Sequence, residues 1–175
     1  ITVGNPELRP DRITVTFDGD AGAERGFTWY TESEAGDPEV MVSEDGAFQK
    51  DVTVFKAEAT VTDGGYMYKA KAVELNPATV YYYRVGDKEK NAYSQTGSFL
   101  TGKDSGAFSF IHLTDTQADS REEAAIAAGT VKTALETVEG AEFIIHGGDI
   151  VENGSNEEMW QNFLNLSQDS LMQTT

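Results

Sequence analysis

The chain has 175 residues, enough for one large domain or for one complete domain and a piece of another, and its 30 acidic and 13 basic residues give a net charge of −17. This charge argues against nucleic acid or an anionic membrane as the main partner, and no apolar run approaches the roughly 18 residues of a membrane span. The lack of cysteine excludes a disulfide framework and a thiolate zinc site.

The charge is distributed unevenly along the chain, which predicts two units. Residues 1–103 hold 17 acidic and 11 basic residues, whereas residues 104–175 hold 13 acidic and 2 basic residues. We therefore place a domain boundary between positions 103 and 104, within a short polar linker at 102–106. Residues 1–3 lack the basic start of a signal peptide, so we expect a soluble chain whose start is compatible with trimming.

Short alternating and β-branched runs fill the first unit and predict an all-β fold. Clusters of Gly, Asp, Asn and Pro separate the runs, as antiparallel strands with tight turns require. The aromatic residues within the runs are expected to serve packing rather than ligand binding. Seven runs predict a two-sheet sandwich: Ile13–Phe17, Gly26–Tyr30, Glu39–Val42, Asp51–Val61, Tyr66–Leu75, Val80–Val85 and Gly97–Leu100.

The periodicity changes after the linker and predicts alternating strands and helices. Phe108–Thr114 and Glu142–His146 are apolar runs typical of strands that are buried on both faces. A capping box follows each run, at Ser120–Glu123 and at Ser155–Glu158, and predicts the start of a helix. The order strand, helix, strand, helix predicts an α/β unit with a parallel strand pair and a right-handed crossover. The expected inward positions of the two helices are Ala124, Ala127, Ala128, Val131, Leu135 and Val138, then Trp160, Phe163 and Leu164.

Oxygen-bearing side chains follow both predicted α/β strands. Asp115 and Asp149 lie at the carboxyl ends of these strands, where open α/β sheets build their sites, and Gln117 comes two residues after Asp115. Neighbouring strands are about 4.8 Å apart, so the two carboxylates can share one cation or bridge a pair. The glycines before Asp149 suit a turn that a phosphate or metal approaches closely, Gly148 above all. A single Asp here could equally be a turn former, but two in register favour a metal site.

Four segments resemble known phosphoesterases. Thr114–Gln117 is similar to the Asp-x-His/Gln motif of the calcineurin-like metallophosphoesterases, and Gly148–Gly154 is similar to their Gly-Asp motif. Gly26–Thr31 and Leu75–Gly86 resemble the fibronectin type III-like domain that precedes the catalytic domain of purple acid phosphatases. The resemblance implies a fibronectin III-like sandwich at 1–103, followed at 104–175 by the first part of an α/β metallophosphoesterase domain.

The resemblance also implies roles for individual residues. Asp115 and Gln117 would bind one metal ion, and Asp149 would bridge two ions, for which Fe, Zn or Mn is expected. The family's later ligands, in Asn-His and Gly-His-x-His motifs, do not occur before Thr175, so the site is expected to be incomplete and the rest of the catalytic domain missing. No catalytic residue beyond these ligands can be carried over.

For three further residues near these motifs, a role other than metal binding is favoured over metal binding. His112 and His146 each lie three residues before the corresponding Asp, an odd offset that places them on the opposite strand face, so we expect both to be buried and hydrogen-bonded. Glu152 stands where purple members have a tyrosine iron ligand. A colourless site with a solvated Glu152 is therefore expected.

The function implied by the resemblance is metal-dependent hydrolysis of a phosphate monoester or diester, with activity of these 175 residues alone left open. The alternative is a non-enzymatic secreted or surface binding module, in which an acidic extension binds cations without hydrolysis. A calcium-binding adhesin repeat is disfavoured, because the chain has no internal repeat and no dense Asp-x-Asp loop. An extracellular or cell-surface location is expected from the resemblance, and the substrate cannot be read from these residues.

Overall fold

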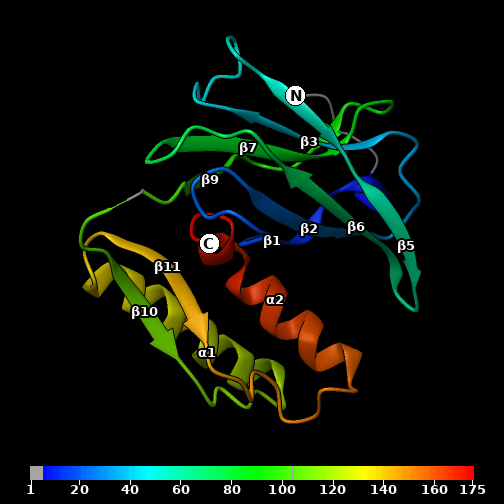
Figure 1. Ribbon diagram of the computed structural model, residues 1–175. Helices are drawn as coiled ribbons and strands as arrows, with labels where there is room; N and C mark the ends of the chain where they lie inside the picture. Colours follow the sequence, from blue (N-terminus) through cyan, green and yellow to red (C-terminus); the bar gives the residue numbers. More distant parts are fainter. Residues whose placement is uncertain (1–5, 104) are drawn as a thin grey trace.

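The computed structural model describes residues 6–103 and 105–175, and it places a β-sandwich above a small α/β layer (Figure 1). Asp104 in the linker and residues 1–3 lie outside the described residues. A short 3-10 helix, η1 (Pro6–Leu8), precedes the strands. No helix in the described part of the chain is long and apolar enough to cross a membrane.

Two antiparallel sheets form the sandwich, as the alternating runs predict. The first sheet has the order β1 (Asp11–Thr16), β2 (Arg25–Thr31), β6 (Gly65–Ala72), β5 (Glu58–Thr62). In the second, β4 (Thr53–Lys56) pairs with β3 (Pro38–Ser43) and β3 with β7 (Val80–Asp87), while β8 (Ala92–Tyr93) and β9 (Gly97–Leu100) both pair with β7.

One predicted run proves to be two strands. The segment 51–61 breaks at Ala57, so that β4 ends in one sheet and β5 begins in the other. Periodicity alone could not place this break, because the residues on both sides of it favour strands. The two-residue strand β8 was not predicted, since it is too short to carry an alternating pattern.

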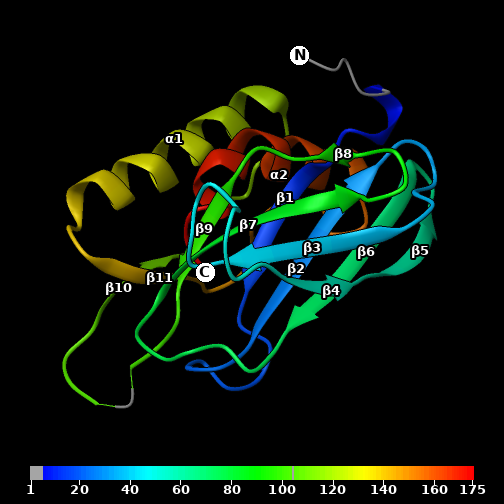
Figure 2. The ribbon, with the colours of Figure 1, turned by 90° about the horizontal axis from the view of Figure 1, so that it is seen from above.

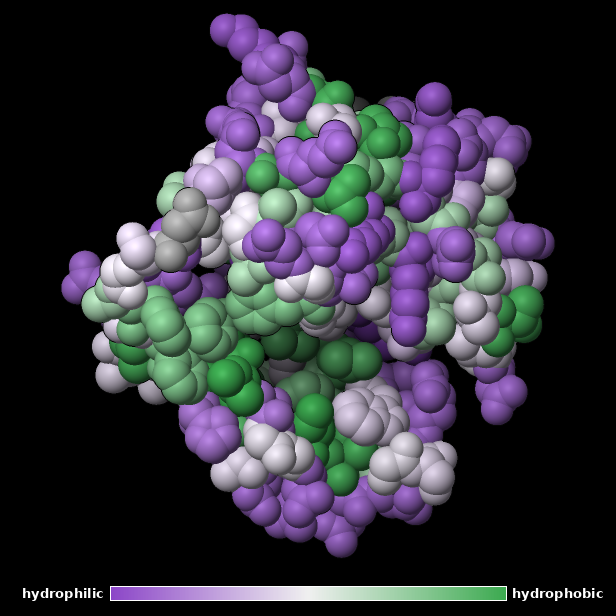
Figure 3. Space-filling view, in the orientation of Figure 1, coloured by the Kyte–Doolittle hydropathy of each residue, from purple (hydrophilic) through white to green (hydrophobic). Residues whose placement is uncertain are grey.

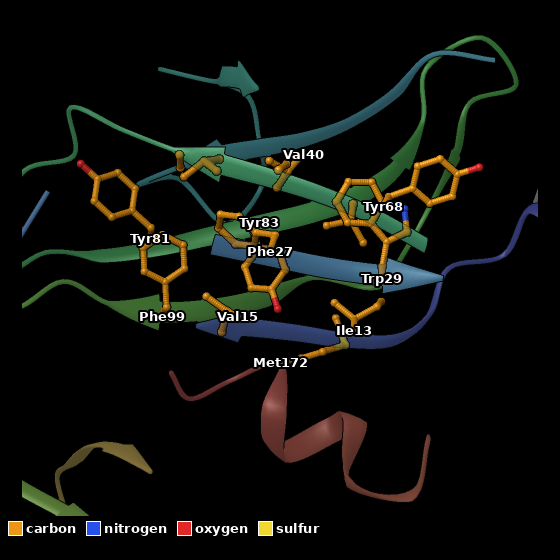
Figure 4. Packing of buried hydrophobic residues seen from close by; sticks show 14 of the residues in the cluster. Ile13, Val15, Phe27, Trp29, Val40, Tyr68, Tyr81, Tyr83, Phe99 and Met172 are labelled. Atoms are coloured by element: carbon orange, nitrogen blue, oxygen red, sulfur yellow. The ribbon is translucent and has the colours of Figure 1, made fainter. Parts of the chain in front are cut away.

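Aromatic side chains fill the space between the two sheets (Figure 4). Trp29 stacks on Tyr68 with ring centroids 5.5 Å apart, and Phe27 lies 4.8 Å from Tyr83 and 5.7 Å from Phe99. Burial of such large rings dominates the stability of a small core. The aromatic runs therefore serve packing, as expected, with Trp29 and Tyr83 fully buried.

The α/β layer contains a parallel pair of strands, as predicted. Strand β10 (Ser109–Leu113) pairs with β11 (Ala141–His146), and helix α1 (Arg121–Thr137) connects them. Helix α2 (Glu157–Leu171) follows β11 and lies beside α1 (Figure 2). A cluster of Ala127, Val151 and Phe163 joins the two helices to the loop after β11.

The prediction that these two strands are buried on both faces is wrong. Phe110 is 45% exposed and Ile145 is 44% exposed, and Phe108 just before β10 is 59% exposed. Ile111, on the other face of β10, is buried. The two strands meet no further strand among the described residues. Phe17 of the sandwich contacts Phe143 on their outer face, with ring centroids 5.4 Å apart, but no described element covers Phe110 or Ile145, and this face forms hydrophobic surface in Figure 3.

One of the two predicted helix caps is confirmed and the other is shifted by a residue. The hydroxyl of Ser120 accepts a hydrogen bond from the amide of Glu123 at the start of α1, as predicted. At the start of α2 the cap is Asn156, whose side chain accepts from the amides of Glu158 and Met159. Ser155 instead bonds the side chain of Asn153, so the predicted capping box at 155–158 is wrong.

The end of the chain closes one side of the sandwich. Gln168 of α2 accepts a hydrogen bond of 3.1 Å from the backbone amide of Ile13 on the edge strand β1. Just after α2, the carbonyl of Met172 accepts from Ser98 on β9, and the Met172 side chain is fully buried in the sandwich core. Gly97 permits this approach, because a Cβ there would lie 2.7 Å from the Met172 carbonyl oxygen. The boundary at 103/104 stays a prediction, but the last helix packs on both sides of it.

Candidate functional site

The loops after β10 and β11 run side by side at the carboxyl end of the parallel pair. The amide of Asp115 donates to the carbonyl of Gly148 at 3.1 Å, and the amide of Gln117 donates to the carbonyl of Asp149 at 2.8 Å. A parallel bridge between Ala118 and Val151 continues the pairing beyond these residues. The structure thus places Asp115, Gln117 and Asp149 on two adjacent, hydrogen-bonded loops.

All three residues adopt an uncommon backbone conformation. Their φ angles are +55° at Asp115, +40° at Gln117 and +49° at Asp149, and Gly148 has a φ of +124°. Such conformations are costly for residues other than glycine and concentrate at functional sites. Gly148 is required by its φ rather than by crowding, because an added Cβ would meet nothing within 4 Å.

The side chains at these positions are exposed and rich in oxygen. Asp115 accepts a hydrogen bond of 2.6 Å from the hydroxyl of Thr114, which orients one of its carboxylate oxygens. A groove of about 300 Å³ beside Asp115 is bounded by the first loop and by Glu123, Ile126 and Thr130 of α1. The acidic loops are therefore open to an incoming ion or small molecule.

The donor set fits part of a metal site. Carboxylate and carboxamide oxygens suit hard divalent ions, which take six or more oxygen ligands or complete their shell with water. Within residues 6–103 and 105–175, no group of three or more His, Cys, Asp or Glu side chains could hold a metal ion. Metal binding by Asp115, Gln117 and Asp149 therefore stays a prediction, and these donors alone supply only a fraction of the ligands. Glu152 is exposed, as expected.

The two histidines lie on opposite faces of the β10–β11 sheet. His146 pairs with Leu113 and faces Phe163 of α2 at a ring distance of 6.4 Å, whereas His112 pairs with Ile145 on the uncovered face. The prediction that both are buried is wrong for His112, which is exposed because no described element covers that face. His146 is half-buried and hydrogen-bonded, in line with its prediction.

The ring of His146 contacts both loops. Its Nδ1 accepts from the amide of Gly148 at 3.3 Å, and its Nε2 lies 3.2 Å from the hydroxyl of Thr116. Burial lowers the pKa of His146 below its usual value of about 6.5, and the nearby Asp115 carboxylate opposes this only in part. The sequence predicts neither this link nor a role for Thr116. Thr116 nevertheless lies between the predicted ligands Asp115 and Gln117, and His146 lies three residues before Asp149.

Comparison with known proteins relates the chain to phosphatases. The model of the family "Purple acid Phosphatase, N-terminal domain" matches residues 10–101. A purple acid phosphatase from yellow lupin (Lupinus luteus) seeds superposes with a TM-score of 0.78 and 14% identity, over 95% of this chain and 34% of the lupin chain. The chain therefore spans about a third of the length of that structure, and the likeness shows a shared fold.

A second solved structure has a weaker likeness. The third fibronectin III domain of human KIAA0343 protein gives a TM-score of 0.37 at 13% identity, over 60% of this chain and 92% of that domain. No curated protein matches the chain significantly.

Proposed function

Because the chain belongs, through residues 10–101, to the family of purple acid phosphatase N-terminal domains, we propose that it forms part of a metal-dependent phosphoesterase. The observation that carries this proposal is the pairing of the two acidic loops, in which the amide of Gln117 bonds the carbonyl of Asp149 at 2.8 Å. The pairing gathers hard oxygen donors at the carboxyl end of a parallel strand pair, where α/β folds build sites. The proposed reaction is hydrolysis of a phosphate monoester or diester.

The proposed roles are those that the resemblance to the metallophosphoesterases implies. Asp115 and Gln117 lie on one loop and would hold one ion, whereas Asp149 on the facing loop would bridge two ions, with Fe, Zn or Mn as candidates. When bound, such a pair supplies Lewis acidity and activates a water for attack on phosphorus. The Thr114 hydroxyl would keep one Asp115 oxygen oriented, since it bonds that oxygen at 2.6 Å. The remaining ligands and the substrate contacts would come from residues outside 1–175.

Charge supports a cationic cofactor at this position. Residues 104–175 carry 13 acidic and 2 basic residues, and this excess would repel an anionic phosphate ester if it were not neutralised. Bound cations are often the largest local charges in a site and reverse such repulsion. The same acidity favours the alternative function, a secreted or surface module that binds cations without hydrolysis. A location outside the cell or at its surface is proposed for either case.

The test compares the 175-residue chain with a protein extended beyond Thr175. Each is loaded with Mn²⁺, Zn²⁺ or iron and assayed with a chromogenic phosphate ester. We expect turnover only in the extended protein, abolished by Asp149→Asn and retained in Glu152→Gln, with no visible charge-transfer band in the iron form. Normal turnover in the Asp149→Asn protein would contradict the assigned role. Metal binding without turnover in the extended protein would favour the binding module.

A further inference from the structure

The Thr116 hydroxyl joins the two acidic loops through two hydrogen bonds. It lies between Asp115 and Gln117 in the first loop, and it donates its only proton to the carbonyl of Ile150 in the second loop at 2.8 Å. The same oxygen lies 3.2 Å from Nε2 of His146. Because its proton is already used, Thr116 can only accept from this nitrogen, so Nε2 must carry a hydrogen.

The other nitrogen of His146 gives the same result independently. The amide of Gly148 points at Nδ1 from 3.3 Å, and an amide can only donate. Nδ1 must therefore be free of hydrogen. The two contacts together select one form of the ring, the neutral tautomer with hydrogen on Nε2, and they engage both ring nitrogens within the protein.

These contacts surround Asp149 on both sides. Gly148 precedes it and bonds His146, while Ile150 follows it and bonds Thr116. In the first loop, Thr116 lies between Asp115 and Gln117, the two predicted metal ligands. Four residues thus hold the backbones of both acid-bearing loops in a fixed relation, without contributing a ligand themselves.

We propose that His146 and Thr116 are positioning residues that clamp the loops bearing Asp115, Gln117 and Asp149 into the arrangement a metal ion requires. This inference deepens the proposed function and rests on it for the identity of the ion. The loops carry three non-glycine residues at positive φ, so their conformation needs support from contacts of this kind. Residues that orient ligands typically change metal affinity 10- to 100-fold when replaced.

The first test determines the tautomer of His146 in the absence of any metal. The chain has only two histidines, so the ring nitrogens of each can be assigned by comparing ¹⁵N–¹H spectra of the 175-residue chain with those of His112→Phe. We expect the neutral Nε2–H tautomer for His146 at pH 7.5. A Nδ1–H or doubly protonated ring would overturn the clamp, whatever the function of the site.

The second test removes one contact at a time. Thr116→Val keeps the shape of the side chain but loses both hydrogen bonds, and Thr116→Ser keeps both. His146→Asn can still accept from Gly148, whereas His146→Gln can still donate to Thr116. We expect faster amide exchange at Asp115, Gly148 and Gln117 in Thr116→Val, near-normal exchange in Thr116→Ser, and protection of Gly148 in the Asn but not the Gln variant.

The matched control is Thr137→Val in α1, which loses a 2.7 Å hydroxyl bond to the carbonyl of Thr133 at a site remote from the loops. It should leave loop exchange unchanged. In the protein extended beyond Thr175, titration with Mn²⁺, followed by electron paramagnetic resonance, should then show affinity reduced about 10- to 100-fold in Thr116→Val. Unchanged exchange and affinity in Thr116→Val would overturn the proposal. If the extended wild-type protein fails to bind Mn²⁺, the proposed metal site is refuted, while exchange and tautomer still decide the clamp.

Discussion

The sandwich and the β10–β11 sheet show two different ways of treating an apolar strand face. In the sandwich, two sheets cover one another, and Trp29, Val40 and Tyr83 are completely buried. In the β10–β11 sheet the helices cover one face, and Phe108 and Phe110 remain about half exposed on the other. The first region contains its own core, whereas the second leaves apolar surface that a larger fold would bury.

Helix α2 connects the two regions and draws its stability from both. Its Phe163 lies in the small cluster with Ala127 and Val151, behind the acidic loop. Its C-terminal end reaches the sandwich, where Gln168 bonds Ile13 and Met172 enters the core. Arg12 of β1 adds a 3.7 Å ion pair to Glu157 at the start of the helix. The sandwich therefore supports the helix that follows the candidate site.

Replacing Met172 and Met159 in separate variants should measure the difference in packing between the two regions. The loss of stability on replacing Met172 is the largest effect we expect. Met172→Ala removes a fully buried side chain from the sandwich core, so it should lower the free energy of unfolding by about 2–5 kcal/mol. Met159→Ala removes the same atoms from a half-buried position in the α2 cluster and should cost clearly less. Urea unfolding monitored by tryptophan fluorescence compares the two, and equal losses would show that the regions are equally well packed.

The pH dependence of the sandwich should depend on Asp87, with a smaller effect. Burial alone would raise the pKa of this carboxyl, but hydrogen bonds from the amides of Gly36, Asp37 and Glu89 outweigh burial and lower the pKa. The stability that the charged form contributes is present above pH about 4 and is lost as pH falls through the folded-state pKa.

Asp87→Asn should therefore cost about 1.5–3 kcal/mol at pH 7, the usual value for hydrogen bonds to a charged group. It should also flatten the loss of stability below pH about 4, because the variant has no carboxyl to protonate there. Unfolding at several pH values checks both expectations. Asp45→Asn is the control, since that carboxylate also accepts from two amides but lies in a less buried turn. If the stability of Asp87→Asn fell more steeply with decreasing pH than that of the wild type, the charged Asp87 carboxylate would not be stabilising the fold.

The sequence predicted most of the strands and the placement of the acidic residues, because both follow from local pattern. Every predicted strand run contains a strand, and Asp115 and Asp149 do follow the parallel pair. What it could not predict depends on long-range packing. Three features are decided by which elements meet in space: the break at Ala57, the burial of only one face of β10, and the position of the Met172 side chain in the sandwich core.

The candidate site was predictable only as a set of residue types at strand ends. The spacing from each histidine to its Asp does not tell on which face of the sheet each ring lies or what it touches, since His112 and His146 lie on opposite faces and His146 contacts both loops. The contact between His146 and Thr116 joins residues 30 positions apart and depends on how the two loops are placed relative to one another in space. His112, with the same spacing, is exposed, because only packing distinguishes the two faces.

The smallest expected effect on stability is at the uncovered sheet face, and it tests the comparison most directly. Phe110 stacks on Phe143 with centroids 5.2 Å apart yet remains 45% exposed, so Phe110→Ser should cost about 1 kcal/mol or less. It should nevertheless reduce the binding of a hydrophobic dye more than Val61→Ser does. Val61 is 75% exposed on β5, where its partner across the strand pair is Tyr66. A loss of several kcal/mol on replacing Phe110 would mean that this face belongs to a core after all.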